Sequence, residues 1–219
     1  MFIILREKTG DDLAMTEKTD RRKARTKQLL HEAFIELLKE KNSDAITVTD
    51  VSGRAGVNRG TFYLHYRDMP DMLQQLQDEV FQTIQKQAKQ FNHQEAIACM
   101  DKNELYPAIV ELFEEIARHA EFLRLMFGPQ GDISYAGRFR KLMASTIYEK
   151  IRYIPPVTSS MPRDYFIAYI SYANFGMLLH WIESGLSQTP KQMTRMMMQV
   201  MHYGPLVSLG LREAPGEKS

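Results

Sequence analysis

Residues 47–66 read TVTDVSGRAGVNRGTFYLHY, and this stretch decides the fold of the chain. Thr47 and Asn58 are residue types that cap helix N-termini, and Asp50 stands where a capping-box partner of Thr47 belongs. Between the two caps, Gly56 supplies the left-handed residue that closes many helices. The stretch therefore predicts two short helices joined by a tight turn at that glycine.

A third helix is predicted directly after the motif. Asp68 can cap it, and Pro70 fits its first turn, where no backbone donor is needed. Helices as short as the two in the motif are marginal by themselves, so the unit needs a packed scaffold. The apolar positions available for that packing are Val51, Ala55, Val57 and Phe62.

The scaffold is predicted immediately upstream, as an amphipathic helix over residues 22–41. Its apolar positions follow the i, i+3, i+4, i+7, i+8 spacing of a helix with one buried face. They are Leu30, Ala33, Phe34, Leu37 and Leu38. The region around the start of this helix is basic, with Lys18, Arg21, Arg22, Lys23, Arg25 and Lys27. Since the whole chain carries a formal net charge of only +1, positive charge is concentrated here. The basic residues are either a solvated helix end or, beside a helix-turn-helix, a clamp for DNA phosphates.

The segment 22–76 resembles the DNA-binding domain of the TetR family of bacterial transcriptional regulators. The resemblance is carried by the run AGVNRGTFYLHYRD at 55–68, where glycine, cap, aromatic pair and following acidic cap fall in register. It implies that Arg59 contacts a base, with guanine as a partner, in a palindromic double-stranded operator. It implies that Phe62 and Tyr66 hold the recognition helix to the core. The implied DNA-binding residues are Arg22, Lys23, Arg25, Thr26, Thr47, Thr49, Asn58, Arg59, Gly60, Thr61, Tyr63, His65 and Arg67.

Two positions depart from the family pattern. Gly53 lies inside the first short helix, where relatives more often have a helix former, and it costs about 1 kcal/mol relative to Ala. Met69 stands where many relatives carry Lys, so one phosphate contact is either lost or passed to Arg67. Both departures argue for a modest affinity for DNA.

The rest of the chain shows no sustained strand-like alternation and predicts further helices. Their ranges are about 71–90, 102–127, 134–153, 162–184 and 191–211. Glycine, proline and serine mark breaks at 128–129, 155–156 and 187–190. The chain has 219 residues, of which 44% are hydrophobic, and this is ample for a sizeable core.

These patterns and the resemblance together predict an all-α fold. It has a three-helix N-terminal DNA-binding domain with a helix-turn-helix, and a larger helical C-terminal domain for ligand binding and dimerisation. The predicted divisions are a flexible extension over 1–17, the DNA-binding domain over 18–70, the regulatory domain over 71–212 and a flexible tail over 213–219. Residues 1–14 are expected to have little fixed structure.

The last two predicted helices are apolar on nearly every side, as the stretch YFIAYISYANFGMLLHW at 165–181 shows. Such helices are either buried in their own chain or packed against a second copy. The resemblance favours the second copy, because the last two helices of TetR-like proteins form a four-helix dimer interface. The residues expected there are Tyr165, Ala168, Tyr169, Tyr172, Gly176, Leu179, Met193, Met197 and Met201.

The middle of the chain is rich in aromatic residues and methionine, which can host an apolar ligand or can simply form core. TetR-like proteins usually bind a small molecule there and release DNA in response. The candidate effector-binding residues are Tyr106, Phe113, Phe122, Met126, Phe139, Met143, Tyr172 and Phe175.

Other kinds of chemistry find no support in the sequence. Cys99 is the only cysteine, which excludes an intrachain disulfide and is compatible with a reducing cytoplasm. The histidines lack metal-binding spacing, and there is no nucleophile elbow, Walker A or dinucleotide motif. We therefore expect no enzyme activity, no cofactor, no metal and no membrane partner. Polar residues interrupt both apolar helices, which argues against transmembrane segments.

The sequence thus predicts a cytoplasmic homodimeric repressor relieved by a small molecule that it does not identify. Two alternatives stay open. One is a TetR-like adaptor or coactivator that is controlled by a protein partner, like regulators of dihydroxyacetone kinase, which the C-terminal half resembles loosely around FGMLLHWIESGL at 175–186. The other is a lipid- or drug-binding protein with a vestigial DNA-binding unit. A closed apolar cavity in the middle helices would favour small-molecule control, and a solid core there would favour a protein partner.

Overall fold

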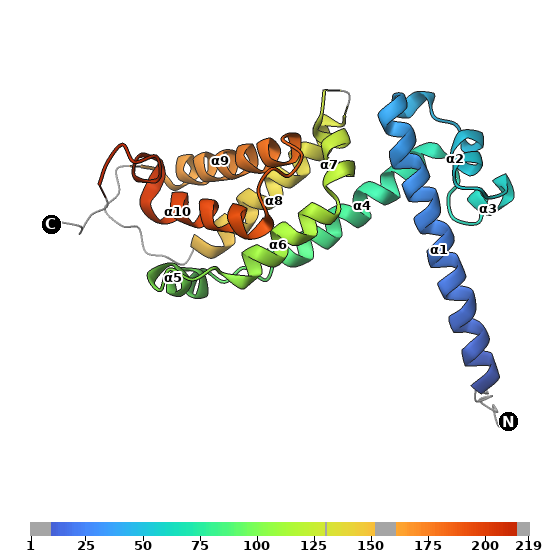
Figure 1. Ribbon diagram of the computed structural model, residues 1–219, viewed down its shortest axis with the longest axis horizontal. Coiled ribbons are helices and arrows are strands. Elements are labelled where there is room, and N and C mark those ends of the chain that lie inside the picture. Colours follow the sequence, from blue (N-terminus) through green and yellow to red (C-terminus); the bar gives the residue numbers. More distant parts are fainter. Residues whose placement is uncertain (1–9, 130, 152–160, 214–219) are drawn as a thin grey trace. The chain divides into compact units, whose positions relative to one another are not determined.

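The computed structural model describes residues 10–129, 131–151 and 161–213, and within these ranges it is built from helices without a β-strand (Figure 1). This confirms the predicted all-α class. The chain divides into two compact units, residues 1–76 and 77–219. The predicted domain boundary after residue 70 falls inside a helix, α4 (Met69–Ala88), and the division lies six residues later.

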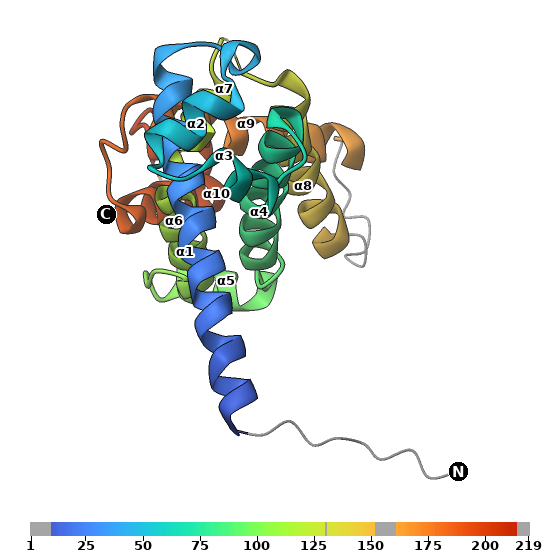
Figure 2. The same cartoon turned by 90° about the vertical axis from the view of Figure 1, so that its right-hand side faces the viewer.

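The first unit contains the predicted helix-turn-helix. Its elements are α1 (Gly10–Glu40), the 3-10 turn η1 (Ser43–Ala45), α2 (Val48–Arg54), α3 (Arg59–Tyr63) and the start of α4. Helix α2 packs against α1, and α3 packs against α2, which Figures 1 and 2 show from two directions. The predicted scaffold helix and the two short helices are therefore all present.

Each predicted cap is confirmed. The hydroxyl of Thr47 accepts a hydrogen bond from the backbone N–H of Asp50 at 3.2 Å, and the Asp50 carboxylate accepts one from the N–H of Thr47 at 2.8 Å. The Asn58 side chain accepts from the N–H of Gly60 at 2.9 Å, which starts α3. Between the helices, Gly56 has a φ of +65°, in the left-handed region that favours glycine.

The core of the first unit forms where α1 meets the motif. Phe34, Val51 and Phe62 are at most 1% exposed. Tyr66, just after α3, is 2% exposed, and its hydroxyl lies 2.7 Å from the Nε2 of His31 on α1. This hydrogen bond satisfies two buried polar groups and joins the end of the motif to the scaffold.

Helix α1 begins at Gly10, earlier than the expected start near residue 22, so residues 10–17 of the predicted flexible extension are helical. Nothing in 10–22 breaks a helix, because this stretch lacks proline and has glycine only at its first position. Residues 1–9, the predicted break at 155–156 and the tail beyond residue 213 lie outside the described residues.

The second unit is a larger assembly of helices. After α4 it contains α5 (His93–Asp101), α6 (Pro107–Arg118), α7 (Ala120–Phe127), α8 (Ile133–Ile151), α9 (Arg163–Glu183) and α10 (Pro190–Ser208). Helix α8 packs against α9, α6 packs against α10, and α7 contacts both α8 and α9. No helix in the described ranges is long and apolar enough to cross a lipid bilayer.

Three features of the second unit differ from the prediction. Helix α5 was not expected, and it is started by Asn92, whose side chain accepts from the N–H of Gln94 at 2.9 Å. The single helix predicted over 102–127 starts later, at Pro107, and is broken at His119, where ψ is 7°. In α10, Gly204 has φ 77° and ψ 169°, so a kink precedes Pro205.

Aromatic side chains fill the core of the second unit. The rings of Phe113 and Trp181 meet edge to face with centroids 5.3 Å apart, which joins α6 to α9. Tyr135 and Phe139 on α8 meet in the same way at 5.2 Å. The phenol of Tyr135 donates a hydrogen bond to the carbonyl of Gln77 at 2.9 Å, so α8 is tied to α4.

Candidate functional site

The α3 helix divides into a buried and an exposed side. Phe62 faces the core and is fully buried, whereas Arg59, Gly60 and Tyr63 are exposed. Phe62 also packs edge to face on the ring of Tyr63 with centroids 5.6 Å apart, which orients that phenol at the surface. A short helix is thereby held by one aromatic anchor while its opposite side remains available to a ligand.

The basic part of α1 lies beside the C-terminal end of α3. Burial, followed by the positive charges of Lys27 and Lys23, lowers the pKa of His65 below its usual value. The charges of both lysines therefore act on His65 from α1. The two lysines form a positively charged edge beside His65 and the exposed side of α3.

None of the residues predicted to bind DNA is buried. Arg22, Lys23 and Arg25 are exposed on α1, and Thr47 and Thr49 are exposed at the start of α2. Two further members, Thr26 and Arg67, have partners within the unit. The hydroxyl of Thr26 donates to the carbonyl of Arg22 at 3.0 Å, and the guanidinium of Arg67 lies 3.2 Å from the carboxylate of Asp71.

Two features of this surface were not foreseen. Leu64, which ends α3, is 83% exposed, so the exposed side of the motif includes an apolar side chain. The guanidinium of Arg54 contacts the carboxylates of Glu40 at 2.9 Å and Glu36 at 3.3 Å, which clamps α2 to α1. The signal for the clamp was present in the i, i+4 spacing of the two glutamates on α1.

The second unit contains an apolar cavity of about 140 Å³. Its walls come from α4, α6, α8, α9 and α10, with Phe91 contributed by the segment after α4. Among the residues that the structure describes, polar side chains line it at two positions, Thr146 and Asn174. The described residues that line it are Ile84, Ala88, Phe91, Ile109, Leu112, Phe113, Ile116, Phe139, Leu142, Met143, Thr146, Ile147, Asn174, Leu178, Met197 and Met201.

Of the predicted effector-binding residues, Phe113, Phe139 and Met143 line this cavity. The others do not, because their side chains are used elsewhere. Tyr106 is buried, and its hydroxyl accepts from the N–H of Asn92 at 2.8 Å. The remaining four make other contacts. The rings of Phe122 and Phe175 pack on those of Tyr135 and Phe127, respectively. The sulfur of Met126 accepts a hydrogen bond from the amide of Gln77, and the exposed ring of Tyr172 lies under the guanidinium of Arg140.

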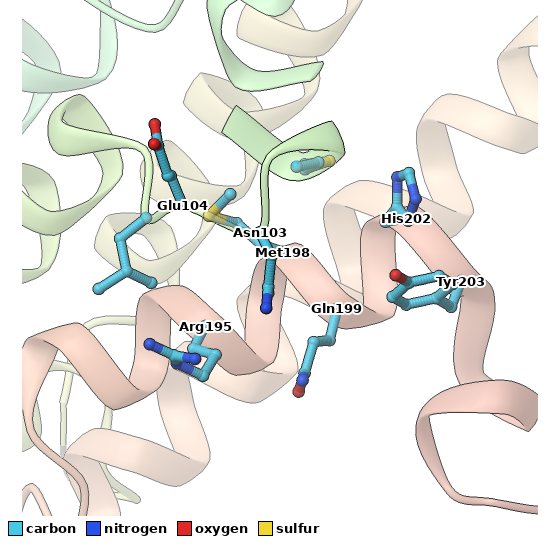
Figure 3. Close-up of a pocket in the computed structure, with 9 residues that line it drawn as sticks. Asn103, Glu104, Arg195, Met198, Gln199, His202 and Tyr203 are labelled. Atoms are coloured by element: carbon cyan, nitrogen blue, oxygen red, sulfur yellow. The ribbon is translucent and has the colours of Figure 1, made fainter. Parts of the chain in front are cut away.

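A second hollow in the same unit is too small to compete as a ligand site. It is lined by Asn103 and Glu104, which precede α6, and by Arg195, Gln199, His202 and Tyr203 of α10 (Figure 3). Its volume of about 30 Å³ is of the order of a single water molecule. The sulfur of Met198 at this place is already used, because it accepts from the N–H of Tyr106 at 3.4 Å.

Helix α9 presents an apolar stripe on the surface of its own chain. Tyr165, Tyr169 and Tyr172 are 51% to 69% exposed, and Ala168 and Gly176 beside them are also exposed. We call these five residues the α9 tyrosine stripe. Leu179, at the end of the same region, is half-buried. The structure thus leaves most of the predicted dimer residues of α9 accessible.

The predicted dimer residues of α10 differ in exposure. Met193 is only 3% exposed, Met197 is half-buried and lines the cavity, and Met201 lines the cavity but is 40% exposed. The three methionines follow each other at i, i+4, i+8 and therefore share one side of the helix. Met193 is therefore taken up by the core of its own chain, whereas the exposed part of Met201 remains accessible.

The described part of the chain contains no group of three or more His, Cys, Asp or Glu side chains arranged to hold a metal ion. The acidic side chain of Glu115 is instead paired within α6 and at its end, where it contacts Arg118 and His119. These contacts explain how a carboxylate that is only 7% exposed is accommodated.

Two family models match the chain. Residues 30–76 match the model described as bacterial regulatory proteins of the tetR family, and residues 103–203 match a transcriptional regulator C-terminal region. A curated relative is the HTH-type transcriptional regulator YxbF of Bacillus subtilis (strain 168), with 20% identity over 190 residues. That match covers 85% of this chain and 47% of YxbF, so the chain spans about half the length of this relative.

Solved structures share the fold. A TetR transcriptional regulator from Streptococcus agalactiae 2603V has a TM-score of 0.55 and 23% identity, and the match covers 85% of this chain and 98% of that one. The fatty acid degradation regulator FadR from Bacillus halodurans has a TM-score of 0.53 and 13% identity, with coverage of 80% and 94%. The dihydroxyacetone kinase operon activator DhaS has a TM-score of 0.50 and 15% identity, with coverage of 85% and 95%.

Proposed function

This chain belongs to the TetR family of bacterial transcriptional regulators, and on that premise we propose that it is a homodimeric repressor whose release from a palindromic operator is triggered by a small molecule. The observation that carries the proposal is the exposed side of α3. There Arg59, Gly60 and Tyr63 are accessible on a helix that Phe62 anchors to the core. A helix held in this way can enter a major groove and present its side chains to base edges.

The charge distribution supports double-stranded DNA as the ligand. The chain as a whole is nearly neutral, with a formal net charge of +1, but cations gather on α1. Lys23 and Lys27 act electrostatically on His65 at the end of the motif, so this positive charge lies beside the recognition surface. Local positive charge is what phosphate neutralisation requires. Binding to chromosomal DNA would place the protein in the cytoplasm.

The α9 tyrosine stripe supports homodimer formation. Exposed tyrosines gathered on one helix form an amphipathic surface of the kind enriched at protein interfaces. Small residues at Ala168 and Gly176 allow a second helix to approach closely. A twofold dimer has a further physical rationale, because two copies of α3 can read two half-sites of a palindrome. In this proposal α10 contributes to the dimer interface through its solvent-exposed side, and not through the side on which Met193 is buried.

The apolar cavity supports control by a small molecule. Its lining includes Ile84 and Ala88 of α4, the helix that begins at Met69, soon after the motif. A ligand in the cavity therefore touches the element that is continuous with the DNA-binding part of the chain. For release to occur, the ligand must bind the DNA-free state more tightly than the DNA-bound state.

The adaptor alternative receives less support. A protein-controlled adaptor would be expected to have a solid core among the middle helices, whereas this chain has a cavity, although one that is partly open rather than closed. Its fold also resembles the dihydroxyacetone kinase operon activator DhaS, but at 15% identity that likeness concerns the fold alone.

A gel-shift experiment tests the proposal. The full chain is titrated onto the duplex DNA that lies upstream of its own gene and onto a scrambled duplex of equal length and composition. Preferential retardation of the upstream fragment, with a stoichiometry of two chains per palindrome, is the expected result. Equal affinity for both duplexes would overturn sequence-specific recognition. Addition of cell metabolite fractions to the bound complex then tests release.

A further inference from the structure

We infer that Leu64 packs against the 5-methyl group of a thymine in each half-site of the operator, so that one position of the operator is read by an apolar contact and not by a hydrogen bond. The inference rests on the proposed function, because it concerns how the exposed side of α3 reads DNA. It adds Leu64 to the recognition surface as a residue that determines sequence specificity, and it names the chemical group that this residue contacts.

Leu64 is held firmly at its backbone but is left in water at its side chain. Its φ of −75° and ψ of −16° continue the helix, and its N–H donates to the carbonyl of Thr61 at 3.3 Å. The side chain is 83% exposed, more than any other large apolar side chain in the described part of the first unit. A single exposed leucine is common on protein surfaces, so its position on the helix decides whether it has a use.

Gly60 and Thr61 share the side of α3 that Leu64 occupies. They stand four and three positions before it, which is the spacing of neighbours on one side of a helix. Helical side chains lean toward the N-terminus, so the Leu64 side chain extends over the turn that contains Gly60. Gly60 is exposed and has no side chain of its own. The backbone of α3 is therefore open to close approach by a ligand beside Leu64.

The chemistry of this side of α3 selects one group in the major groove. Gly60 and Leu64 carry no hydrogen-bonding side chain, and Thr61 adds a methyl group next to its hydroxyl. Base edges in the major groove present donors and acceptors, with one apolar exception, the 5-methyl group of thymine. A leucine placed against a donor or an acceptor would remove water from it without offering a partner. The thymine methyl is therefore the group that Leu64 can cover with a gain in free energy.

Positive charge beside Leu64 favours the placement of this side chain in the groove. His65 is the next residue, and the charges of Lys27 and Lys23 on α1 act on it. Such charges bind the phosphates that border the groove. Arg59 stands five positions before Leu64, which is about 140° around the helix axis. Arg59 and Leu64 can thus read different base pairs, the first by hydrogen bonds and the second by apolar contact.

Replacement of thymidine by deoxyuridine tests the contact, because it removes the 5-methyl group and leaves the hydrogen bonds of the base pair intact. The full chain first selects duplexes from a pool of random sequence. In the duplex that binds most tightly, symmetry-related thymidines are then changed one pair at a time, and binding is measured by fluorescence anisotropy. For one pair, affinity should fall by about fourfold for each methyl group lost, and hence by about sixteenfold when both half-sites are changed.

Variants of Leu64 assign the methyl contact to this residue. Leu64→Ala should bind the thymidine and deoxyuridine duplexes equally, with the affinity that the wild type has for the deoxyuridine duplex. Because the side chain is exposed, this variant should melt as the wild type does. Leu64→Met keeps an apolar side chain and should still distinguish the two duplexes. Leu29→Ala removes another exposed leucine of the same unit, on α1, and should retain the full difference.

Failure of the methyl contact and failure of the proposed function give different results. If the selected duplex is bound but no thymidine pair responds to loss of its methyl group, the contact is refuted and sequence-specific DNA binding stands. If Leu64→Ala weakens binding yet keeps the same difference between thymidine and deoxyuridine, Leu64 contacts sugar and phosphate, and the contact is again refuted. If the chain enriches no sequence from the pool, the proposed function falls and the methyl contact falls with it.

Discussion

Thr47 and Asp50 hold each other in place by reciprocal hydrogen bonds, and the Nζ of Lys41 lies 2.8 Å from the same Asp50 carboxylate. The pair closes the N-terminus of α2, and Lys41, the residue directly after α1, joins that helix start to the end of α1. A helix of seven residues depends strongly on such a cap because its own hydrogen bonds are few. The position of α2 in the motif therefore rests on polar contacts that are largely at the surface.

Removal of this cap should destabilise the first unit. Thr47→Ala leaves the N–H of Asp50 without its acceptor and should lower the free energy of unfolding by about 1 kcal/mol. Thr49→Ala, two residues further along the same exposed helix start, is the matched control and should change it little. Urea denaturation followed by circular dichroism measures both variants.

Acid should remove the contribution of Asp50. Hydrogen bonds from Lys41 and then from Thr47 hold the pKa of Asp50 well below its usual value. A carboxyl whose pKa is lower in the folded state stabilises the fold above its unfolded pKa, about 3.9, and this stabilisation is lost as the pH falls further. The difference in stability between the wild type and Asp50→Asn should thus be largest near neutral pH. It should shrink steadily below pH about 4; a constant difference would contradict the assignment.

Two glycines of the motif should respond to alanine in opposite directions. Gly53 lies in α2, and the Cβ of an alanine at this position would have no other atom within 4 Å, so Gly53→Ala should raise stability by up to about 1 kcal/mol. Gly56 has a φ of +65°, so Gly56→Ala should lower stability by about 1–2 kcal/mol. Thermal melts of the two variants compare the effects directly, and effects of the same sign would refute this account.

Base and phosphate contacts should differ in their salt dependence. Arg59→Ala should cost about 1–3 kcal/mol of operator binding and relax sequence preference. Lys23→Gln should weaken binding to every duplex. It should also reduce the slope of the logarithm of the binding constant against the logarithm of the salt concentration by about one unit. Lys141→Gln, which removes an exposed lysine from α8, is the control for general charge loss. Fluorescence anisotropy at several salt concentrations measures the three variants, and unchanged operator binding by Arg59→Ala would exclude the base contact.

His65 should make DNA binding depend on pH. Burial and the charges of Lys27 and Lys23 lower its pKa, so the free protein carries a neutral imidazole at pH 7. DNA phosphates favour the protonated form, and binding should therefore tighten as the pH falls below about 6.5, by up to about fivefold. His65→Gln should lose this increase, whereas His202→Gln on α10 should retain it. Anisotropy titrations between pH 5.5 and 8 would reveal the difference.

Charge placed on the α9 tyrosine stripe should separate the dimer. Tyr169→Glu combined with Tyr172→Glu puts two carboxylates into a surface that the proposal buries, so the variant should be monomeric by light scattering. Loss of the second copy should weaken operator binding by about 10²-fold or more. Tyr148→Glu changes another exposed tyrosine, on α8, and should remain dimeric. A dimeric double variant would remove α9 from the interface.

The motif was predictable because its signals are local. Thr47, Asn58 and Asp68 each cap a helix through backbone groups two or three residues away, and Gly56 acts through its own φ angle. Such short-range chemistry can be read from the order of residues. The pairing of His31 with Tyr66 could not, since 35 residues separate the two side chains.

The second unit shows what short-range signals in the sequence cannot predict. Helices α9 and α10 are apolar on several sides, so periodicity alone cannot tell which side faces inward. Met193, which the sequence places at a dimer interface, is buried in its own chain. The break at His119 carries neither glycine nor proline, so the local sequence holds no signal for it.

The sequence by itself therefore determined the all-helical class, the helix-turn-helix and the basic stretch beside it, because these depend on neighbours within a few residues. Tertiary structure alone decided which apolar residues form core, which form the α9 tyrosine stripe and which enclose the apolar cavity. Those distinctions depend on how whole helices rotate and pack, and no short run of residues specifies that.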